Sequence, residues 1–224
     1  MSVTGLYQMI PATDADVGAA DVRAAVDAAA AAFPGWAATG AAKRRTVLLG
    51  AAHLLEERTE ALAGILRQET AGSLAWAEFN IRLAAGQLRQ GAAMATRPVA
   101  ELLAGGPDRA TGREQAGVVV SFVPWNGSMI HCARAIAVTL AVGNTVLIRP
   151  SADAPFTCGI IIADVLAEAG LPDGVVNVVA NDHADAPAAV EALIADPRVR
   201  RVTFTGSIRA GRVAGRLPAQ RPGR

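Results

Sequence analysis

The sequence is poor in aromatic residues, lysine and cysteine, and each scarcity narrows the possible classes of protein. Aromatic residues make up 4% of the 224 residues, and lysine occurs once, at Lys43, whereas arginine is abundant. The net charge of +1 predicts no attraction to nucleic acid or to an anionic membrane. The two cysteines, Cys132 and Cys158, favour a reducing cytosol over a disulfide framework, so we expect a cytoplasmic protein.

Long hydrophobic runs and targeting signals are also lacking. The apolar stretch after Trp125 is interrupted by His131, Arg134 and Asn144, so it is not expected to cross a bilayer. The first twenty residues contain two aspartates and no basic segment, so we expect no signal peptide.

Metal-binding and common nucleotide-binding patterns are missing as well. The three histidines, His53, His131 and His183, are scattered without metal-ligand spacing, so we expect no metal site. We expect His53 on a helix surface and His131 to support packing. The Gly-x-Gly-x-x-Gly fingerprint of dinucleotide-binding turns does not occur.

Hydrophobic periodicity divides the chain into two parts. Helical spacing predicts helices through the first hundred residues: one ending at Pro34-Gly35, one over 47–55, one capped by Thr59 and one over about 74–95. Strands and helices then alternate, with strands predicted at 117–123, 145–148, 175–179 and 199–204, and helices at 129–141, 155–169 and 184–194. This alternation predicts an α/β fold in which βαβ units form a Rossmann-like parallel sheet.

The predicted organisation has four segments. Residues 1–96 form the helical part of a cofactor-binding domain, 97–116 a hairpin-like segment with turn signals at 105–108 and 111–112, and 117–211 the βαβ units. Because Pro218 and Pro222 oppose a helix, 212–224 is predicted to be an irregular tail. That tail is either a frayed end or the point at which a longer protein is cut or shifted in frame.

Polar residues follow two predicted strands, where ligands bind in open parallel sheets. The first group is Pro124-Trp125-Asn126, and the second is Thr205-Gly206-Ser207. The Gly-Ser pair either leaves backbone N–H groups free for a phosphate or makes an ordinary helix cap. Asn126 either caps the helix from Met129 through an Asx-turn or donates its amide to a developing oxyanion.

Several ordered motifs resemble the aldehyde dehydrogenase superfamily over about residues 21–211: "VPWN", "LAVGNTVLIRPS", "GLPDGVVNVV" and "VTFTGS". The stretch "AAFPGWAATGAAKRRTVLLGAAHLLEER" is similar to the helical N-terminal part of that family. The segments "GVVVSFVPWN" and "NVVANDHADAPAAVEALIADPRVRRVTFTGS" most resemble the branch that oxidises aromatic aldehydes such as benzaldehyde, salicylaldehyde and vanillin.

The resemblance implies roles for individual residues. Asn126 would be catalytic, donating its amide to the oxyanion of a tetrahedral thiohemiacetal. The cofactor, NAD or NADP, would be held by Phe122, Val123, Pro124, Trp125, Arg149, Ala152, Phe204, Thr205, Gly206, Ser207 and Ala210. The stretch 96–115 would include the hairpin through which family members form homo-oligomers, and the substrate would be a small aldehyde.

Two departures from the family pattern concern the cofactor. Arg149 and Ala152 stand where the family usually has Lys and Glu. A carboxylate at the second position would bind the ribose hydroxyls and repel a 2′-phosphate, so we expect weaker NAD binding and better tolerance of NADP. The segment "PWNGSM" also replaces the more usual Phe-Pro after the Asn, and Ser128 is expected to cap the following helix.

The largest departure concerns catalysis. The family's nucleophilic cysteine and general-base glutamate lie beyond the Phe-Thr-Gly-Ser motif, and neither is expected in this chain. Cys132 and Cys158 fall among apolar residues of predicted helices, where a thiol is a poor nucleophile. We therefore expect a truncated aldehyde dehydrogenase that is inactive alone. The alternative is a non-catalytic nucleotide-binding or subunit-interaction remnant.

Overall fold

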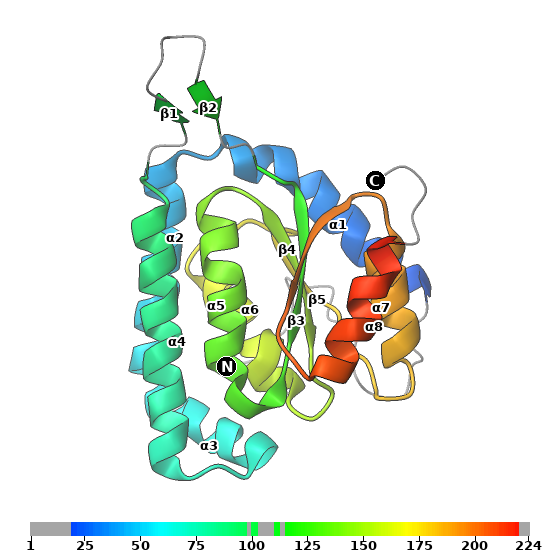
Figure 1. Ribbon diagram of the computed structural model, residues 1–224. Helices are drawn as coiled ribbons and strands as arrows, with labels where there is room; N and C mark the ends of the chain where they lie inside the picture. Colours follow the sequence, from blue (N-terminus) through cyan, green and yellow to red (C-terminus); the bar gives the residue numbers. More distant parts are fainter. Residues whose placement is uncertain (1–18, 98–99, 103–109, 113–114, 220–224) are drawn as a thin grey trace.

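The computed structural model describes residues 19–97, 100–102, 110–112 and 115–219. The chain begins with four helices, α1 (Ala19–Ala38), α2 (Ala41–Glu57), α3 (Thr59–Thr70) and α4 (Leu74–Met94), as the helical spacing predicts. Two short strands, β1 (Ala100–Leu102) and β2 (Ala110–Gly112), then pair antiparallel beyond the end of α4 (Figure 1). The hairpin is therefore present, although its role in assembly stays a prediction.

Strands and helices alternate through the rest of the chain, as predicted. The elements are β3 (Val118–Val123), η1 (Trp125–Gly127), α5 (Ser128–Ala141), β4 (Thr145–Pro150), η2 (Phe156–Ile160), α6 (Ile161–Glu168), β5 (Val176–Val178), α7 (Ala186–Ala195), β6 (Val199–Phe204) and α8 (Ile208–Ala219). The sheet has the order β5-β4-β3-β6, and every neighbouring pair is parallel. The predicted Rossmann-like parallel sheet is thus confirmed.

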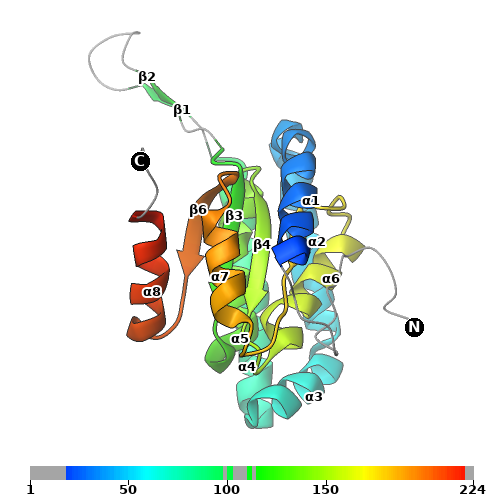
Figure 2. The same ribbon diagram turned by 90° about the vertical axis from the view of Figure 1, so that its right-hand side faces the viewer.

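Helices cover both faces of this sheet. Successive side chains of a strand point to opposite faces, and in β3 the residues Val118, Val120 and Phe122 pack into a core with α1 and α7. Val123 belongs to the larger core on the other face, with α2, α4, α5 and α6. Figure 2 shows the two layers, with α8 standing beside α7 at the β6 edge.

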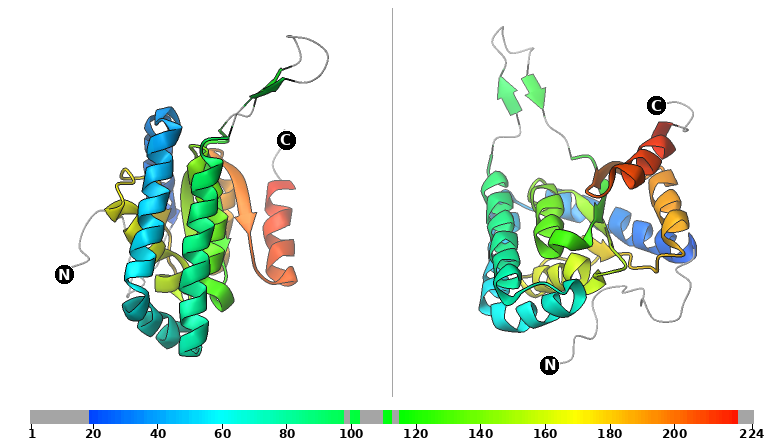
Figure 3. Two further views of the ribbon diagram at one scale, coloured as in Figure 1. Left: turned by 90° about the vertical axis from the view of Figure 1, so that its left-hand side faces the viewer. Right: turned by 60° about the horizontal axis from the view of Figure 1, so that its bottom comes forward.

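The helical N-terminal part shares this core rather than forming one of its own. The indole Nε1 of Trp36 donates to the carbonyl of Leu140 at 3.1 Å, and Arg44 Nε donates to the carbonyl of Ala141 at 2.8 Å. Both bonds satisfy carbonyls at the end of α5. Figure 3 shows α2 and α4 lying side by side along this layer.

Proline and glycine positions produced most of the errors in the predicted boundaries. Helix α1 continues through Pro34 to Ala38, because Trp36 is buried and bonded to α5. Helix α8 likewise reaches Ala219 and includes Pro218, so the predicted irregular tail is wrong as far as residue 219. The predicted turn at 111–112 is part of β2, and the one at 105–108 lies outside the described residues.

Two predicted helix ends have different outcomes. Thr59 does not cap α3, because its hydroxyl donates to the carbonyl of Glu56 at 2.8 Å. Gly170 follows α6 as predicted, and its φ of 93° is a left-handed conformation that favours glycine at the end of a helix.

Candidate functional site

The carboxyl ends of β3 and β6 bring the two predicted polar loops together. Phe122 and Phe204 are register partners on these neighbouring strands, and their ring centroids lie 6.1 Å apart. The backbone N–H of Thr205 donates to the carbonyl of Phe122 at 3.2 Å. The parallel pairing therefore continues into the loop that precedes α8.

An open cleft of about 580 Å³ lies at this edge of the sheet. Ten of the residues proposed to bind the cofactor line it: Phe122, Val123, Pro124, Trp125, Arg149, Phe204, Thr205, Gly206, Ser207 and Ala210. The structure thus gathers them around one space. Their role in binding a cofactor stays a prediction.

The opposite wall of the cleft was not predicted from the sequence. Helix α7 contributes Ala186, Pro187, Val190 and Glu191, α8 contributes Arg209, Val213 and Ala214, and Ser151 follows β4. Pro187 and Val190 are three residues apart and therefore share a face of α7. This spacing predicts an apolar face, but only the tertiary structure decides that the face borders the cleft.

Arg149 supplies positive charge at the end of β4. Its Nε donates to Oδ1 of Asn181 at 3.1 Å, and Asn181 in turn donates from Nδ2 to the carbonyl of Asp182. Burial lowers the pKa of Arg149, while the carboxylate of Asp153 acts in the opposite direction. Within the described residues its two Nη atoms have no hydrogen-bond partner. Asn181 is a site residue that sequence reasoning missed.

The Thr-Gly-Ser loop begins α8. The Ser207 hydroxyl accepts from the backbone N–H of Ala210 at 3.2 Å, so the predicted cap is present. A β-carbon on Gly206 would lie 2.8 Å from the ring of Phe204. A side chain at position 206 would therefore have to push the ring of Phe204 aside.

Asn126 and Ala152 are not among the residues that line this cleft. Asn126 is exposed in η1, directly after the cleft-lining Trp125. The Asx-turn interpretation is not supported, because the N-cap position of α5 is Gly127 and no side chain caps it. Ser128 does not cap α5 either, and its buried hydroxyl has no partner among the described residues.

Neither cysteine is suited to act as a nucleophile. Both thiols are free and buried. Burial raises the pKa of Cys132 well above its usual value and that of Cys158 to about 12. The thiolate is the reactive form, so the predicted burial of both cysteines is confirmed, and the absence of a nucleophile stays a prediction.

The histidines lie in separate places. His53 faces Glu57 on α2 at 3.2 Å, and His183 Nε2 lies 3.0 Å from Asp153 Oδ1. His131, expected only to support packing, lies partly exposed beside the Asn126 loop. In the described part of the chain, no three His, Cys, Asp or Glu side chains are grouped to hold a metal, and no helix could span a membrane.

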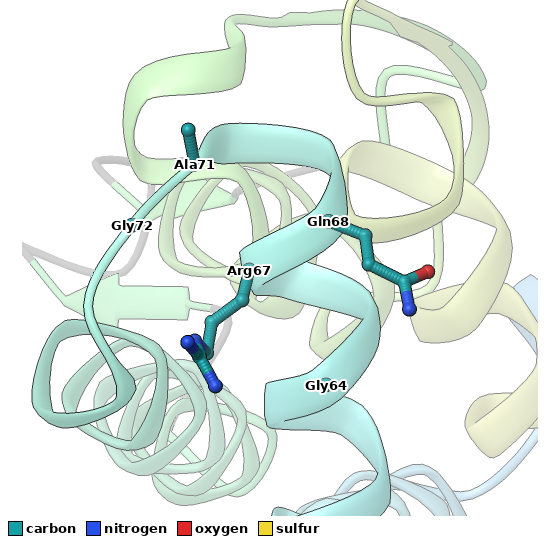
Figure 4. Close-up of a pocket in the computed structure, with 5 residues that line it drawn as sticks. All are labelled: Gly64, Arg67, Gln68, Ala71 and Gly72. Carbon is teal, nitrogen blue, oxygen red and sulfur yellow. The ribbon is translucent and has the colours of Figure 1, made fainter.

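A second hollow lies at the end of α3, away from the cleft. It is lined by Gly64, Arg67, Gln68, Ala71 and Gly72 (Figure 4). The side chains of Arg67 and Gln68 point away from each other, so the labelled polar groups do not converge on one point.

Comparison with known proteins places these features in a family. The sequence pattern described as "Aldehyde dehydrogenase family" matches residues 8–222. A vanillin dehydrogenase of Pseudomonas sp. (strain HR199) is 47% identical over 206 residues, which cover 89% of this chain and 42% of that protein. The chain therefore spans less than half the length of this relative.

Solved structures give the same result. A salicylaldehyde dehydrogenase from Pseudomonas putida G7, complexed with salicylaldehyde, superposes with a TM-score of 0.87 at 35% identity, over 92% of this chain and 43% of that one. An NAD-dependent benzaldehyde dehydrogenase from Corynebacterium glutamicum superposes with a TM-score of 0.83 at 33% identity, over 91% and 45%. Other solved neighbours are described as NAD- or NADP-dependent.

Proposed function

The chain belongs to the aldehyde dehydrogenase family, and we propose that it forms the dinucleotide-binding part of an enzyme that oxidises aromatic aldehydes to carboxylic acids. The observation that carries this proposal is the cleft between the β3 and β6 loops. It lies at the carboxyl ends of parallel strands, which is where open α/β sheets bind their ligands.

The cleft fits NAD or NADP. Aromatic and aliphatic side chains form its walls, Arg149 offers guanidinium N–H groups that have no partner among the described residues, and the N-terminus of α8 opens beside Gly206. Backbone N–H groups at a helix N-terminus suit a pyrophosphate. When bound, the nicotinamide would supply the acceptor for a hydride.

Asn126 would act on the aldehyde. Addition of a thiolate to the carbonyl carbon puts negative charge on the carbonyl oxygen, and the Asn126 amide N–H would donate to it. Cys132 and Cys158 are too deeply buried to supply that thiolate. We infer that the nucleophile and the general base are not among these 224 residues, which alone would not turn over.

A second candidate function is nucleotide or subunit binding without catalysis. Several large apolar side chains of β6 and α8 are exposed: Val202 (39%), Phe204 (37%), Ile208 (76%) and Val213 (56%). Such a surface favours contact with further protein. The β1–β2 hairpin would serve homo-oligomerisation, and the free thiols favour the reducing cytoplasm.

Dinucleotide binding by this chain tests the proposed site. NADP at a hundred times its dissociation constant should stabilise the native state by about 2.7 kcal/mol, measured by thermal or urea unfolding. Arg149→Ala should weaken binding about tenfold, whereas Arg45→Ala, which removes an exposed arginine of α2, should not. Absence of any stabilisation would refute the cleft as the cofactor site.

Turnover separates the two candidate functions. We expect no NADPH formation from benzaldehyde or vanillin by the purified chain, and activity in the enzyme that contains it. Robust turnover by the chain alone would contradict our assignment of the nucleophile. If neither the purified chain nor the enzyme that contains it oxidises the aldehydes, nucleotide or subunit binding would remain as the function.

A further inference from the structure

His131 on α5 is held in one protonation state by its neighbour. Arg134 lies with Nη2 2.9 Å from Nδ1 of His131. A guanidinium has donors only, so Nδ1 accepts this hydrogen bond and the proton of the neutral ring is carried by Nε2. Burial, and then the charge of Arg134, lower the pKa of His131, which keeps the ring neutral near pH 7.

The protonated nitrogen lies beside the proposed oxyanion residue. A β-carbon built on Gly127 would be 2.9 Å from Nε2 of His131, so Gly127 leaves the space that the imidazole occupies. Nε2 therefore lies within about 8 Å of the Asn126 Cα. Within the described residues the Nε2–H group has no acceptor. The described part of the chain thus presents, within about 8 Å of the Asn126 Cα, a hydrogen-bond donor without an acceptor.

Large apolar side chains of α4 lie on the same side of the molecule. Gly91 of α4 packs against Ala137 of α5, and the two helices run in the same direction (Figure 1). Counting about 100° and 1.5 Å per residue from this contact places Leu83, Phe79 and Trp76 on the side that carries His131; His131 lies about 9 Å along the helix axis, and the three α4 residues lie about 12, 18 and 22 Å along it. Leu83, Phe79 and Trp76 are 39%, 40% and 38% exposed.

We propose that His131 is a specificity-determining residue whose Nε2–H donates a hydrogen bond to an oxygen substituent on the ring of an aromatic aldehyde. This inference rests on the proposed function, because it takes the aldehyde oxygen to lie at Asn126. The apolar ring then extends toward α4, where Leu83 is nearest in level to His131 and the tilted rings of Phe79 and Trp76, with centroids 5.5 Å apart, follow further along the helix. His131 selects among rings, whereas Asn126 acts on the aldehyde group that all of them share.

The kinetic test uses the active enzyme that contains this chain. Its substrates are benzaldehyde and the 2-, 3- and 4-hydroxybenzaldehydes. Wild type should have a higher kcat/KM for one hydroxy isomer than for benzaldehyde. His131→Leu should lower kcat/KM for that isomer about tenfold and change kcat/KM for benzaldehyde less than twofold. His131→Gln, which keeps an N–H donor, should recover most of the preference. The matched control is His53→Leu on α2, which should leave kcat/KM unchanged for both the preferred isomer and benzaldehyde.

A purely structural role predicts a different pattern. If His131 only supports packing, His131→Leu lowers kcat/KM for all four aldehydes alike, and His131→Gln gives no selective recovery. Either result overturns the proposal, as does a wild type with no preference for any hydroxy isomer.

Nitrogen NMR of the ¹⁵N-histidine-labelled chain tests the inference without turnover. The ring of His131 should be the Nε2–H tautomer, and Arg134→Gln should remove that bias. The preferred hydroxybenzaldehyde should shift the Nε2 signal of His131 more than benzaldehyde does, with His53 unmoved. Equal shifts, no shifts or an Nδ1–H tautomer would contradict the role of His131. Loss of all aldehyde oxidation together with a selective Nε2 shift would mean that only the proposed function has failed.

Discussion

Gly91 of α4 lies directly against the backbone of Ala137 in α5. A β-carbon on Gly91 would come within 2.7 Å of the Ala137 carbonyl carbon and 2.8 Å of its oxygen. Backbone atoms cannot rotate away as a side chain can. The contact therefore sets the distance between the helix that carries His131 and the helix that carries Trp76 and Phe79.

Gly91→Ala should force α4 and α5 apart and lower the free energy of unfolding by about 1–3 kcal/mol or more. Gly86→Ala is the matched control on the same helix, since nothing lies within 4 Å of its new β-carbon. The free energy of unfolding of Gly86→Ala should rise by about 0.5–1 kcal/mol, because alanine has a higher helix propensity than glycine. Urea unfolding of both variants measures the difference, and equal effects would contradict the close approach.

Glu69 of α3 holds the start of the segment that leads to α6. Oε1 accepts from the backbone N–H of Phe156 at 2.9 Å, and Oε2 accepts from the backbone N–H and the hydroxyl of Thr157 at 2.8 and 2.5 Å. Glu69→Ala should cost about 1–3 kcal/mol in unfolding free energy, because these donors lose their acceptor. Glu60→Ala, at an exposed position of α3, should cost only a few tenths. A similar loss of unfolding free energy in both variants would argue that the hydrogen bonds of Glu69 do not stabilise this segment.

The buried thiols should make stability fall in alkaline solution. The native state keeps protons on Cys132 and Cys158 at pH values where an unfolded thiol, with a pKa of about 8.5, loses them. The native state then binds more protons, so the free energy of unfolding decreases as pH rises from about 8.5 toward 12. Urea unfolding between pH 7 and 10 should show this slope, and replacing both cysteines with alanine should flatten it.

The same thiols should resist modification in the native protein. A thiol-reactive dye at pH 8 should label neither cysteine until urea unfolds the chain, after which both should react. Rapid labelling of native Cys158 would contradict its burial and would reopen the question of the nucleophile.

Ala152→Glu should place a carboxylate next to Ser151, which lines the proposed cofactor cleft, although Ala152 itself does not line it. We expect NAD to bind more tightly and NADP to bind about tenfold more weakly, since the carboxylate would bind ribose hydroxyls and repel a 2′-phosphate. Ala152→Gln, with the same shape and no charge, should affect NADP much less. Isothermal titration of both dinucleotides provides the measurement. Tenfold tighter binding of NAD than of NADP by the wild-type chain would contradict the expected tolerance of NADP.

Asn126→Ala should lower kcat of the active enzyme about 100- to 1,000-fold if its amide stabilises the oxyanion. The residue is exposed and caps no helix, so unfolding free energy should change by less than about 0.5 kcal/mol. Rate and stability measured on the same preparation separate the catalytic role from a structural one. A small change in kcat would remove Asn126 from the mechanism.

Most of the fold follows from patterns that are local in the sequence. Periodicity places α4 and the alternation from β3 to β6, and the polar loops after β3 and β6 point to the correct edge of the sheet. Local rules fail where a distant contact outweighs them. Pro34 lies inside α1 because Trp36 is anchored on α5, over a hundred residues away in the sequence.

The sequence by itself determined which elements form, that the sheet is parallel and that polar loops follow β3 and β6, because side-chain periodicity and turn residues act over a few positions. Only the tertiary structure decided which side chains share the site. The strand order brings Asn181 to Arg149, and helix packing turns α7 toward the cleft. These neighbours depend on how helices and strands pack together, which no short stretch of sequence specifies.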